Sequence, residues 1–192
     1  APDEICAAIE DGQYLANVAT VRQWLDTGGD ANASGPYGPP LLILAAWGGR
    51  ARIIDLLLSR GADVDATDAN GRTAVYEMLN HWMSHRSLPA LRVLLSHGAD
   101  VNLARTTGGF LGGRSPLMIA ANEQGPDIIR LLLRAGADPE HRASDGHTAE
   151  EEYRQRVLDD NVYAGRSADL LRDVRLAGGW VRYALRPHYD LL

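Results

Sequence analysis

The fold is decided by residues 40–66, which read PLLILAAWGGRARIIDLLLSRGADVDA. Residues 41–46 are leucine, isoleucine and alanine, which indicates a short apolar helix, and Gly48 and Gly49 supply the backbone freedom for a break after it. Residues 53–58 place apolar side chains at the i, i+3 and i+4 positions of a second helix, and Gly61 follows where a left-handed cap is expected. Neither helix can bury its apolar face alone, so the stretch predicts a helix–turn–helix unit that stacks on neighbouring copies.

The same unit recurs along the chain. A stop glycine that ends a second helix occurs at Gly28, Gly61, Gly98 and Gly136, and a turn glycine before a first helix occurs at Gly38, Gly71, Gly113 and Gly146. The gap from stop to turn glycine is ten residues in three cases and fifteen in the fourth, and the gap from turn to stop glycine is 23, 27 and 23 residues. The base period is therefore 33 residues, with one insertion of four and one of five.

A 33-residue period with this internal order resembles the ankyrin repeat. The family's Gly-x-Thr-Pro-Leu-x-x-Ala-Ala opening is matched best by residues 113–121 and more loosely by residues 38–46 and 71–75. Its Leu-Leu-Leu-x-x-Gly-Ala-Asp segment is matched by residues 56–63 and 131–138. The resemblance covers roughly residues 3–158. It implies an all-α ankyrin-repeat solenoid of stacked helix–turn–helix units with short hairpin fingers.

We expect residues 1–165 to hold about five repeats, at approximately 3–33, 34–66, 67–103, 104–138 and, in degenerate form, 139–178. Residues 166–192 are expected to form a helical C-terminal cap or to begin a further segment. Because the chain begins at Ala1 and stops on two leucines, we expect that it was cut from a longer protein.

Local sequence features give more detailed expectations. The insertion in the third repeat is expected to lengthen its first helix or the turn after it, through residues 84–87, with Pro89 in the first turn of the second helix. Ser167 is expected to cap the last helix of the fifth repeat. Glu150, Glu151 and Glu152 are expected to form a solvated helix face.

One departure from the family pattern concerns the histidine that usually follows Pro-Leu. The residues at that position are Ile43, Tyr76, Met118 and Glu151. In the family this histidine ties adjacent loops by hydrogen bonds, so the resemblance implies modest stability for this chain.

The composition of the chain argues against several classes of function. The formal net charge of −6 argues against nucleic-acid binding as the main role. All nineteen basic residues are arginine, so no chemistry in this segment depends on a lysine. The single cysteine, Cys6, can form no internal disulfide, which favours an intracellular, cytoplasmic protein with Cys6 in the core. No apolar run is long enough to span a bilayer, so we expect no membrane attachment, and we expect a monomer.

The sequence contains no strong motif for a nucleotide-binding, metal-binding or catalytic site. Residues 108–115 read G-x-x-x-x-G-R-S, but arginine replaces the lysine of a phosphate-binding loop and no buried strand precedes it, so the pattern favours an extended finger. His81 and His85 can share a helix face, yet no further ligand accompanies them, so no metal site is predicted. No nucleophile and base stand in a recognisable order. We therefore predict no catalytic residue, no cofactor and no enzymatic activity.

The candidate binding surface that remains is the one that a repeat solenoid provides. In such a solenoid the fingers and first helices line a concave face, and the resemblance implies partner contacts around each turn glycine and at the end of each first helix. The residues predicted to contact a protein or peptide partner are Tyr37, Trp47, Asn70, Arg72, Tyr76, His81, Phe110, Leu111, Arg114, Asn122, Glu123 and His147. For Tyr76 and Trp82, packing between repeats is an equal alternative.

The leading hypothesis is therefore a non-enzymatic protein–protein interaction module that binds a protein or peptide on its concave face. One alternative is an adaptor whose tail after residue 165 docks a larger complex, and another is a structural spacer within a larger repeat protein. The resemblance also implies a possible hydroxylation of Asn102, because Leu94 lies eight residues before it and Asp100 two residues before it.

Overall fold

The computed structural model describes residues 1–10, 14–35, 38–80, 84–104, 112–123, 126–157, 164–179 and 184. Within these residues the secondary structure consists of ten α-helices and one isolated bridge between Ser34 and Pro40. The helices are α1 (Asp3–Glu10), α2 (Tyr14–Asp26), α3 (Leu41–Trp47), α4 (Ala51–Ser59), α5 (Ala74–Leu79), α6 (Ser84–Ser96), α7 (Pro116–Glu123), α8 (Pro126–Arg134), α9 (Ala149–Val157) and α10 (Ala164–Leu176). In the described part of the chain, no helix has the length and apolar character needed to cross a membrane.

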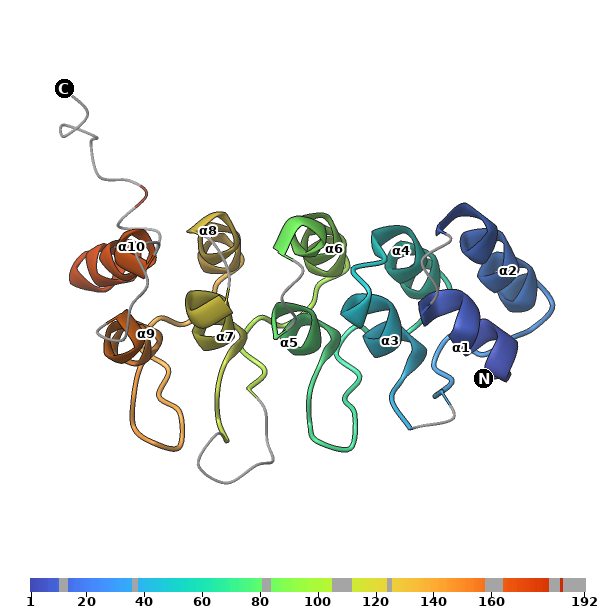
Figure 1. Cartoon of the computed structure of the whole chain (residues 1–192), viewed down its shortest axis with the longest axis horizontal. Helices are drawn as coiled ribbons and strands as arrows, with labels where there is room; N and C mark the ends of the chain where they lie inside the picture. Colours follow the sequence, from blue (N-terminus) through green and yellow to red (C-terminus); the bar gives the residue numbers. More distant parts are fainter. Residues whose placement is uncertain are drawn as a thin grey trace.

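The helices stand in two rows (Figure 1). The odd-numbered helices form one row, the even-numbered helices form the other, and the described parts of the loops before α3, α5, α7 and α9 project beyond the odd-numbered row. We call these loops fingers, and we call the side formed by the fingers and the odd-numbered row the finger face. Helices pack on their neighbours within and across the rows, as α3 does on α1, α4 and α5. The predicted all-α solenoid of stacked helix–turn–helix units is confirmed.

A continuous apolar core runs along both rows. Residues 41–46 of α3 are all at most 5% exposed, because three other helices surround α3. On α4, Ile53, Ile54 and Leu57 are completely buried. Burying one such side chain contributes about 1.5–3 kcal/mol to stability. Cys6 is 4% exposed and belongs to this core, as the sequence predicts.

Two glycines show why this residue recurs in the pattern. Gly61 has a φ of +87°, and it lets the Ala62 N–H turn back to donate to the Leu57 carbonyl oxygen at 3.1 Å. Gly113 has a φ of +73°, and a Cβ placed there would lie 3.2 Å from the backbone nitrogen of Ser144. Residues with side chains enter this backbone region only at a cost, so both positions require glycine.

Hydrogen bonds connect successive repeats through side chains in the exit loops, which are the loops that follow the second helix of each repeat. The Asn32 side chain donates from Nδ2 to the Gly61 carbonyl oxygen at 3.1 Å and accepts from the Asp63 N–H at 2.7 Å. Asn102 makes the same two bonds to Gly136 and Asp138, at 3.1 and 2.9 Å. Between them lies Asp65, which accepts from the Asp100 N–H at 3.0 Å. These three side chains form a hydrogen-bonded ladder along one edge of the solenoid.

The third repeat requires a correction. Its first helix, α5, ends at Leu79, and the insertion lies instead in α6, which begins at Ser84 and has thirteen residues against nine in α4 and α8. Four residues make about one helical turn, so the insertion extends the second helix at its start. Pro89 consequently lies inside α6 and not in its first turn.

The fifth repeat also differs from the prediction at its second helix. α10 begins at Ala164, so Ser167 lies inside the helix and does not cap it, and the proposed boundary after residue 165 falls within α10. Leu170, Leu171 and Val174 are buried, and α10 packs on α8 and α9. Residues 180–183 and 185–192, which belong to the expected C-terminal cap, lie outside the described residues.

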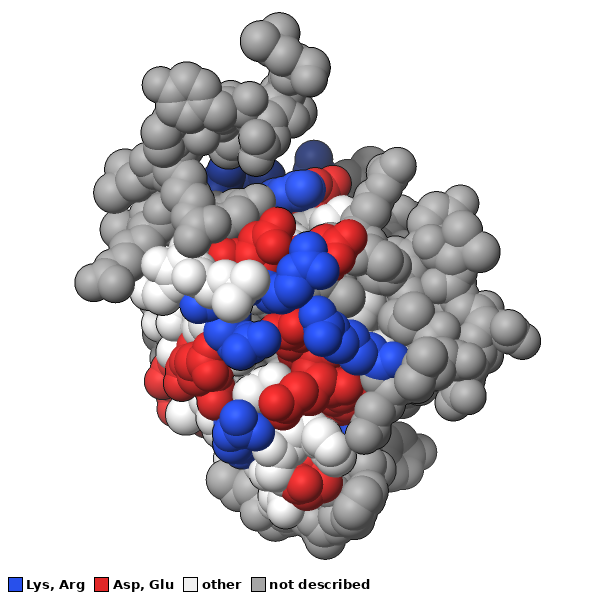
Figure 2. Space-filling view, turned by 90° about the vertical axis from the view of Figure 1, so that its left-hand side faces the viewer, with Lys and Arg blue, Asp and Glu red and all other residues white. Residues whose placement is uncertain are grey.

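The acidic run at the start of α9 is not a solvated face. Glu150 is 4% exposed and Glu152 is 8% exposed, while Glu151 is exposed as predicted. Arginines accompany the buried carboxylates: Arg175 lies 2.7 Å and Arg154 2.8 Å from Glu150, and Arg114 lies 2.5 Å from Glu152. Figure 2 shows acidic and basic side chains interleaved over this end of the solenoid. Pairing makes the burial tolerable, because an unpaired buried carboxylate would be costly.

Candidate partner-binding site

A pocket of about 240 Å³ opens on the finger face between the second and third repeats. Its walls come from the finger before α3, from α3 itself, from the finger before α5 and from α5. The lining residues are Gly38, Pro39, Ile43, Leu44, Trp47, Asp68, Ala69, Asn70, Arg72 and Glu77. We call this the Trp47 pocket.

One wall of the Trp47 pocket is apolar. Ile43 and Leu44 are 3% and 5% exposed and belong to the core, so this wall is fixed by packing. Trp47 is the last residue of α3, and 48% of it is exposed. It is one of three large hydrophobic residues that the described part of the chain exposes, with Leu103 and Leu176. The wall therefore ends in a wide aromatic surface in contact with water.

The opposite side of the pocket is an acid–base triad. The Arg72 guanidinium lies 2.7 Å from Asp68 Oδ2 and 2.9 Å from Glu77 Oε2. The carboxylate side chains are only 8% and 10% exposed. Asp68 Oδ1 also accepts from the backbone N–H groups of Asn70 and Arg72, at 2.8 and 2.9 Å. These bonds hold the finger before α5 in one shape and fix the position of the guanidinium.

Asp68 and Arg72 stay ionised at neutral pH. Burial alone would raise the pKa of Asp68, but the hydrogen bonds it accepts from Arg72 and Asn70 outweigh burial and hold that pKa below its ordinary value. Burial alone would lower the pKa of Arg72, but its hydrogen bond to Asp68 and the charge of Glu77 raise it instead. Two carboxylates and one guanidinium thus meet on this side of the pocket.

Three of the predicted contact residues meet in this pocket. Trp47, Asn70 and Arg72 come from two different repeats, and the structure places all three in the lining. Asp68 and Glu77 belong to the same site, although the sequence analysis does not select them. A comparison of equivalent positions would find Asp68, because its counterparts are Gly35, Phe110 and Ala143.

The prediction that Tyr76 contacts a partner needs correction. It is 3% exposed and belongs to the core, so the packing alternative applies and the side chain offers no surface to a partner. The histidine of the family pattern is polar and the phenol ring here is largely apolar, which suits it to this buried position.

Arg114 and His147 lie farther along the finger face. Arg114 forms its ion pair with Glu152 and so links the fourth repeat to the fifth. His147 lies in the finger before α9, where its backbone N–H donates to Asp145 Oδ1 at 3.0 Å and its ring Nδ1 lies 3.4 Å from the same oxygen. Neither residue lines the Trp47 pocket.

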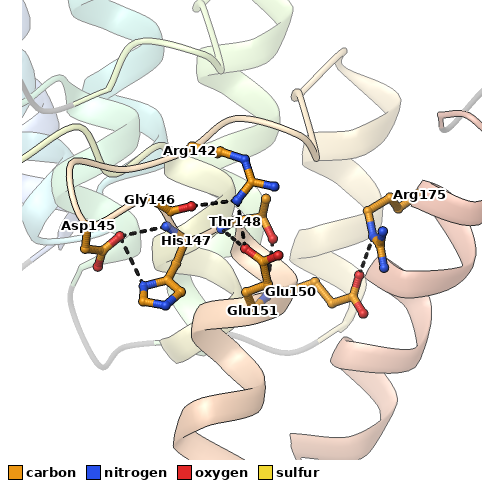
Figure 3. A network of polar contacts seen from close by, with 8 residues as sticks. All are labelled: Arg142, Asp145, Gly146, His147, Thr148, Glu150, Glu151 and Arg175. Carbon is orange, nitrogen blue, oxygen red and sulfur yellow. Dashed lines mark hydrogen bonds and ion pairs between the residues drawn. The ribbon is translucent and has the colours of Figure 1, made fainter.

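The finger before α9 is held by a polar network (Figure 3). Thr148 and Glu151 form a reciprocal capping box: the Thr148 N–H donates to Glu151 Oε2 at 3.0 Å and the Glu151 N–H donates to Thr148 Oγ1 at 3.3 Å. Arg142 donates to the same Oε2 at 3.1 Å and to the Gly146 carbonyl oxygen at 2.6 Å. The N–H of Thr148 is the leading cause that holds the pKa of Glu151 below its ordinary value. Glu151, which stands where the family has histidine, thus holds this finger in place through the hydrogen bonds it accepts.

The other predicted residues are not placed. Tyr37, His81, Phe110 and Leu111 lie outside the described residues, and so does Trp82. Asn122 and Glu123 belong to α7, but the structure does not describe their side chains. Among the described residues, no three histidine, cysteine, aspartate or glutamate side chains are grouped as metal ligands would be.

A larger hollow of about 400 Å³ lies between α2 and α4 on the opposite row. Arg22, Arg52 and Arg60 surround it, and Arg60 is paired with Asp26 at 2.8 Å. Its arginines are exposed, and exposed ion pairs contribute little to affinity or stability. The Trp47 pocket, with its buried wall and its fixed triad, is the better-formed site.

Comparison with known proteins agrees with this architecture. A family model for ankyrin repeats (3 copies) matches residues 5–105 and 42–143. An ankyrin repeat-containing protein of Treponema pallidum is 30% identical over 138 residues, which cover 71% of this chain and 42% of that protein. An ankyrin repeat and KH domain-containing protein of Caenorhabditis briggsae is 32% identical over 142 residues, 72% of this chain and 5% of that protein.

The mouse B-cell lymphoma 3 protein homolog is 39% identical over 84 residues, which cover 43% of this chain and 17% of that protein. The chain thus spans less than half the length of each of these curated relatives. The family match extends over most of the chain and agrees with the five stacked helix pairs. This chain belongs to the ankyrin repeat family.

Proposed function

We propose that this chain is a protein-interaction module that holds a protein or peptide partner on its finger face, with the Trp47 pocket as the anchoring point. Ankyrin repeats are generally protein–protein interaction modules, and the family is generally non-enzymatic. The observation that carries the proposal is the half-exposed Trp47 beside the buried wall of Ile43 and Leu44.

The energetics favour an anchor at this position. A tryptophan side chain can bury 150–250 Å², so covering the exposed half of Trp47 contributes on the order of 2–3 kcal/mol. The wall and the triad are fixed before binding, so little ordering opposes association there. Tryptophan and arginine are also the residues that most often dominate binding energy at protein interfaces.

A native-lysate pull-down with mass spectrometry tests the proposal. Trp47→Ala is expected to lose a partner that wild type captures, while its melting temperature stays close to that of wild type because the side chain is half exposed. Asn80→Ala is the matched control, because Asn80 occupies the equivalent position at the end of α5. Equal capture by all three proteins would show that binding lies elsewhere.

The alternatives from the sequence stay predictions. An adaptor role would place the docking element in the tail. However, α10, which ends at Leu176, packs on α8 and α9, so the deletion that tests this role begins after Gly179 and leaves α10 intact. Deletion of residues 180–192 should leave partner capture intact under our proposal. Under the adaptor alternative, that deletion should abolish recruitment of a second component. The structural-spacer alternative, a monomeric state and a cytoplasmic location likewise stay predictions.

A further inference from the structure

The even-numbered row has one helix position that can be followed through every repeat. Each second helix ends two residues before a glycine with a positive φ, so positions counted back from that glycine are equivalent. The residues six places before these glycines are Arg22, Asp55, Arg92, Arg130 and Arg172. Arginine is therefore the usual residue at this position, and the second repeat departs from it.

In the last two repeats, the arginine at this position pairs with a carboxylate of its own helix. The guanidinium of Arg130 lies 3.0 Å from Asp127, and that of Arg172 lies 3.2 Å from Asp169. In both cases the aspartate stands three residues earlier, a spacing that brings side chains together on a helix surface. These two repeats therefore supply the negative charge that their arginine pairs with.

The first and third repeats lack that carboxylate. Three residues before Arg22 stands Ala19, and three residues before Arg92 stands Pro89. Both arginines are exposed, and neither forms an ion pair within the part of the chain that the structure describes. Each therefore presents a positive charge to the solvent from the same position of its repeat.

The second repeat lies between these two arginines and has the order of charges reversed. Arg52 stands three residues before Asp55, and Asp55 lies 3.0 Å from the ring of His97. Because α4 packs on both α2 and α6, Arg22, Arg52 and Arg92 come from three adjacent helices (Figure 1). We call these three residues the arginine row. Arg52 has a contact of its own, so the charges available to a ligand are those of Arg22 and Arg92.

The hollow of about 400 Å³ between α2 and α4 forms part of the same surface. Arg22 and Arg52 line it, together with the half-buried Val18 and the buried Leu56. A ligand that crosses α4 from Arg22 to Arg92 therefore passes a depression that is partly apolar.

Helix packing sets the distance that such a ligand must span. Packed helices lie about 8–10 Å apart, so Arg22 and Arg92, two helices apart, stand about 16–20 Å from each other. A polyproline II segment returns to the same side every three residues, and six of its residues span about 19 Å. Its backbone needs no hydrogen-bonding partner, whereas a β-strand laid on this helical surface would find no strand to pair with.

We propose that the arginine row binds an acidic segment in the polyproline II conformation, with carboxylates six residues apart paired to Arg22 and Arg92. The residues between these carboxylates cross α4 beside the hollow, where an apolar ring such as that of proline packs near Val18. This surface lies on the opposite row from the Trp47 pocket, so the inference stands apart from the proposed function.

The charge of the whole chain favours a short acidic peptide over a nucleic acid. The formal net charge is −6, so a long polyanion is repelled by the molecule as a whole. A peptide with a few carboxylates meets less of this repulsion, because salt screens charges that lie beyond about 10 Å.

The test uses a fluorescent peptide of Glu-Pro-Pro repeated five times, with anisotropy as the readout at low salt. The control peptide has the same composition, with its glutamates in one block at one end. Both are titrated with wild type, with Arg22→Gln/Arg92→Gln and with Arg142→Gln/Arg154→Gln. The last variant loses the same charge from exposed arginines of the fifth repeat, and Glu150 keeps Arg175 as its partner there.

We expect the spaced peptide to bind wild type more tightly than the block peptide does. Its affinity should fall about fivefold in Arg22→Gln/Arg92→Gln, the size of two exposed ion pairs, and should stay close to wild type in the control variant. Asp55→Arg should raise the affinity about twofold, because it restores arginine to the position that the second repeat lacks. The Asp55 side chain is 64% exposed, so this variant should fold, and circular dichroism melting checks every protein.

Two sets of results would overturn the inference. Equal affinities for the two peptides, or equal losses in the two double variants, would mean that net charge alone acts and that the row is no site. Tighter binding of a thymidine oligonucleotide, or of a helical peptide with glutamates seven residues apart, would assign the row to another class of partner. Trp47→Ala should leave binding of the spaced peptide unchanged, which keeps this test separate from that of the proposed function.

Discussion

Asp65 occupies the exit-loop position of the second repeat, where Asn32 and Asn102 stand in the first and third. As an aspartate it can accept the Asp100 N–H bond but cannot donate to the Gly98 carbonyl oxygen, whereas each asparagine makes both bonds to the next repeat. We expect Asp65→Asn to complete the ladder and raise the free energy of unfolding by about 1 kcal/mol. The reverse change, Asn102→Asp, should lower it by a similar amount.

Urea unfolding followed by circular dichroism measures both differences. Equal stabilities for wild type and both variants would mean that the ladder bonds exchange with water at no net gain.

Asp68 leads to a prediction about acid stability. Its pKa in the folded protein lies below the ordinary value of 3.8, so its carboxylate stabilises the fold at higher pH, and that stability is lost as pH falls through the folded pKa. The free energy of unfolding should therefore decline as pH drops below 3.8. The decline should be shallower in Asp68→Asn, which cannot titrate there. Parallel pH profiles for the two proteins would contradict this role.

Asn102 remains the predicted site of hydroxylation. Leu94 is completely buried and Val101 is 2% exposed, while Asn102 is tied to Gly136 and Asp138. A modifying enzyme could reach the segment only when these contacts open, so we expect partial modification. Intact-mass spectrometry of natively purified protein, with Asn102→Ala as control, should show a minor species heavier by one oxygen. A single unmodified mass would remove the prediction.

At the scale of single residues, the sequence predicts the stop and turn glycines well, because a positive φ leaves few other choices. It does not predict the burial of Glu150, since that depends on Arg175, which stands 25 residues later and reaches it only through the packing of α10 on α9. The stacking of the repeats determines which side chains pair across them. The sequence pattern within one repeat therefore does not predict these pairs.

At the scale of elements, α6 combines an insertion with an internal proline. Pro89 lacks the N–H that would continue the helix ladder, and its ring crowds the preceding turn. Pro89→Ala should therefore raise the free energy of unfolding by about 1 kcal/mol or more, even though the unfolded chain gains some freedom. Urea unfolding decides the sign. A loss of stability would mean that Pro89 begins the stable part of the helix, as the sequence suggests.

The presence of a helix is easier to predict from the sequence than the residue at which the helix begins. The apolar residues of α4 and α8 define both helices, because their cores and ends coincide with the 33-residue frame. The starts of α6 and α10 fall among polar residues outside that frame, where neither capping residue nor periodicity decides between a longer turn and a longer helix.

At the scale of the whole molecule, the main helix–helix contacts between repeats in the described part of the chain join adjacent repeats, so stability should depend on how many interfaces remain. A chain that ends at residue 143 loses α9 and α10 and uncovers the faces of α7 and α8 that pack on them. We expect it to melt at a lower temperature and to bind a hydrophobic dye. Deletion of residues 180–192 alone, which spares α10, is the control and should change neither property. Similar melting of both truncated chains would contradict the neighbour-by-neighbour account.

The Trp47 pocket draws its two walls from adjacent repeats, and this has a mechanical consequence. The width of the pocket depends on how the second and third repeats stack on each other, because α3 and α5 carry its walls. Stretching would part the walls and release a bound segment, whereas compression would close them on it. We therefore expect the affinity for the proposed partner to change with the force along the axis of the solenoid.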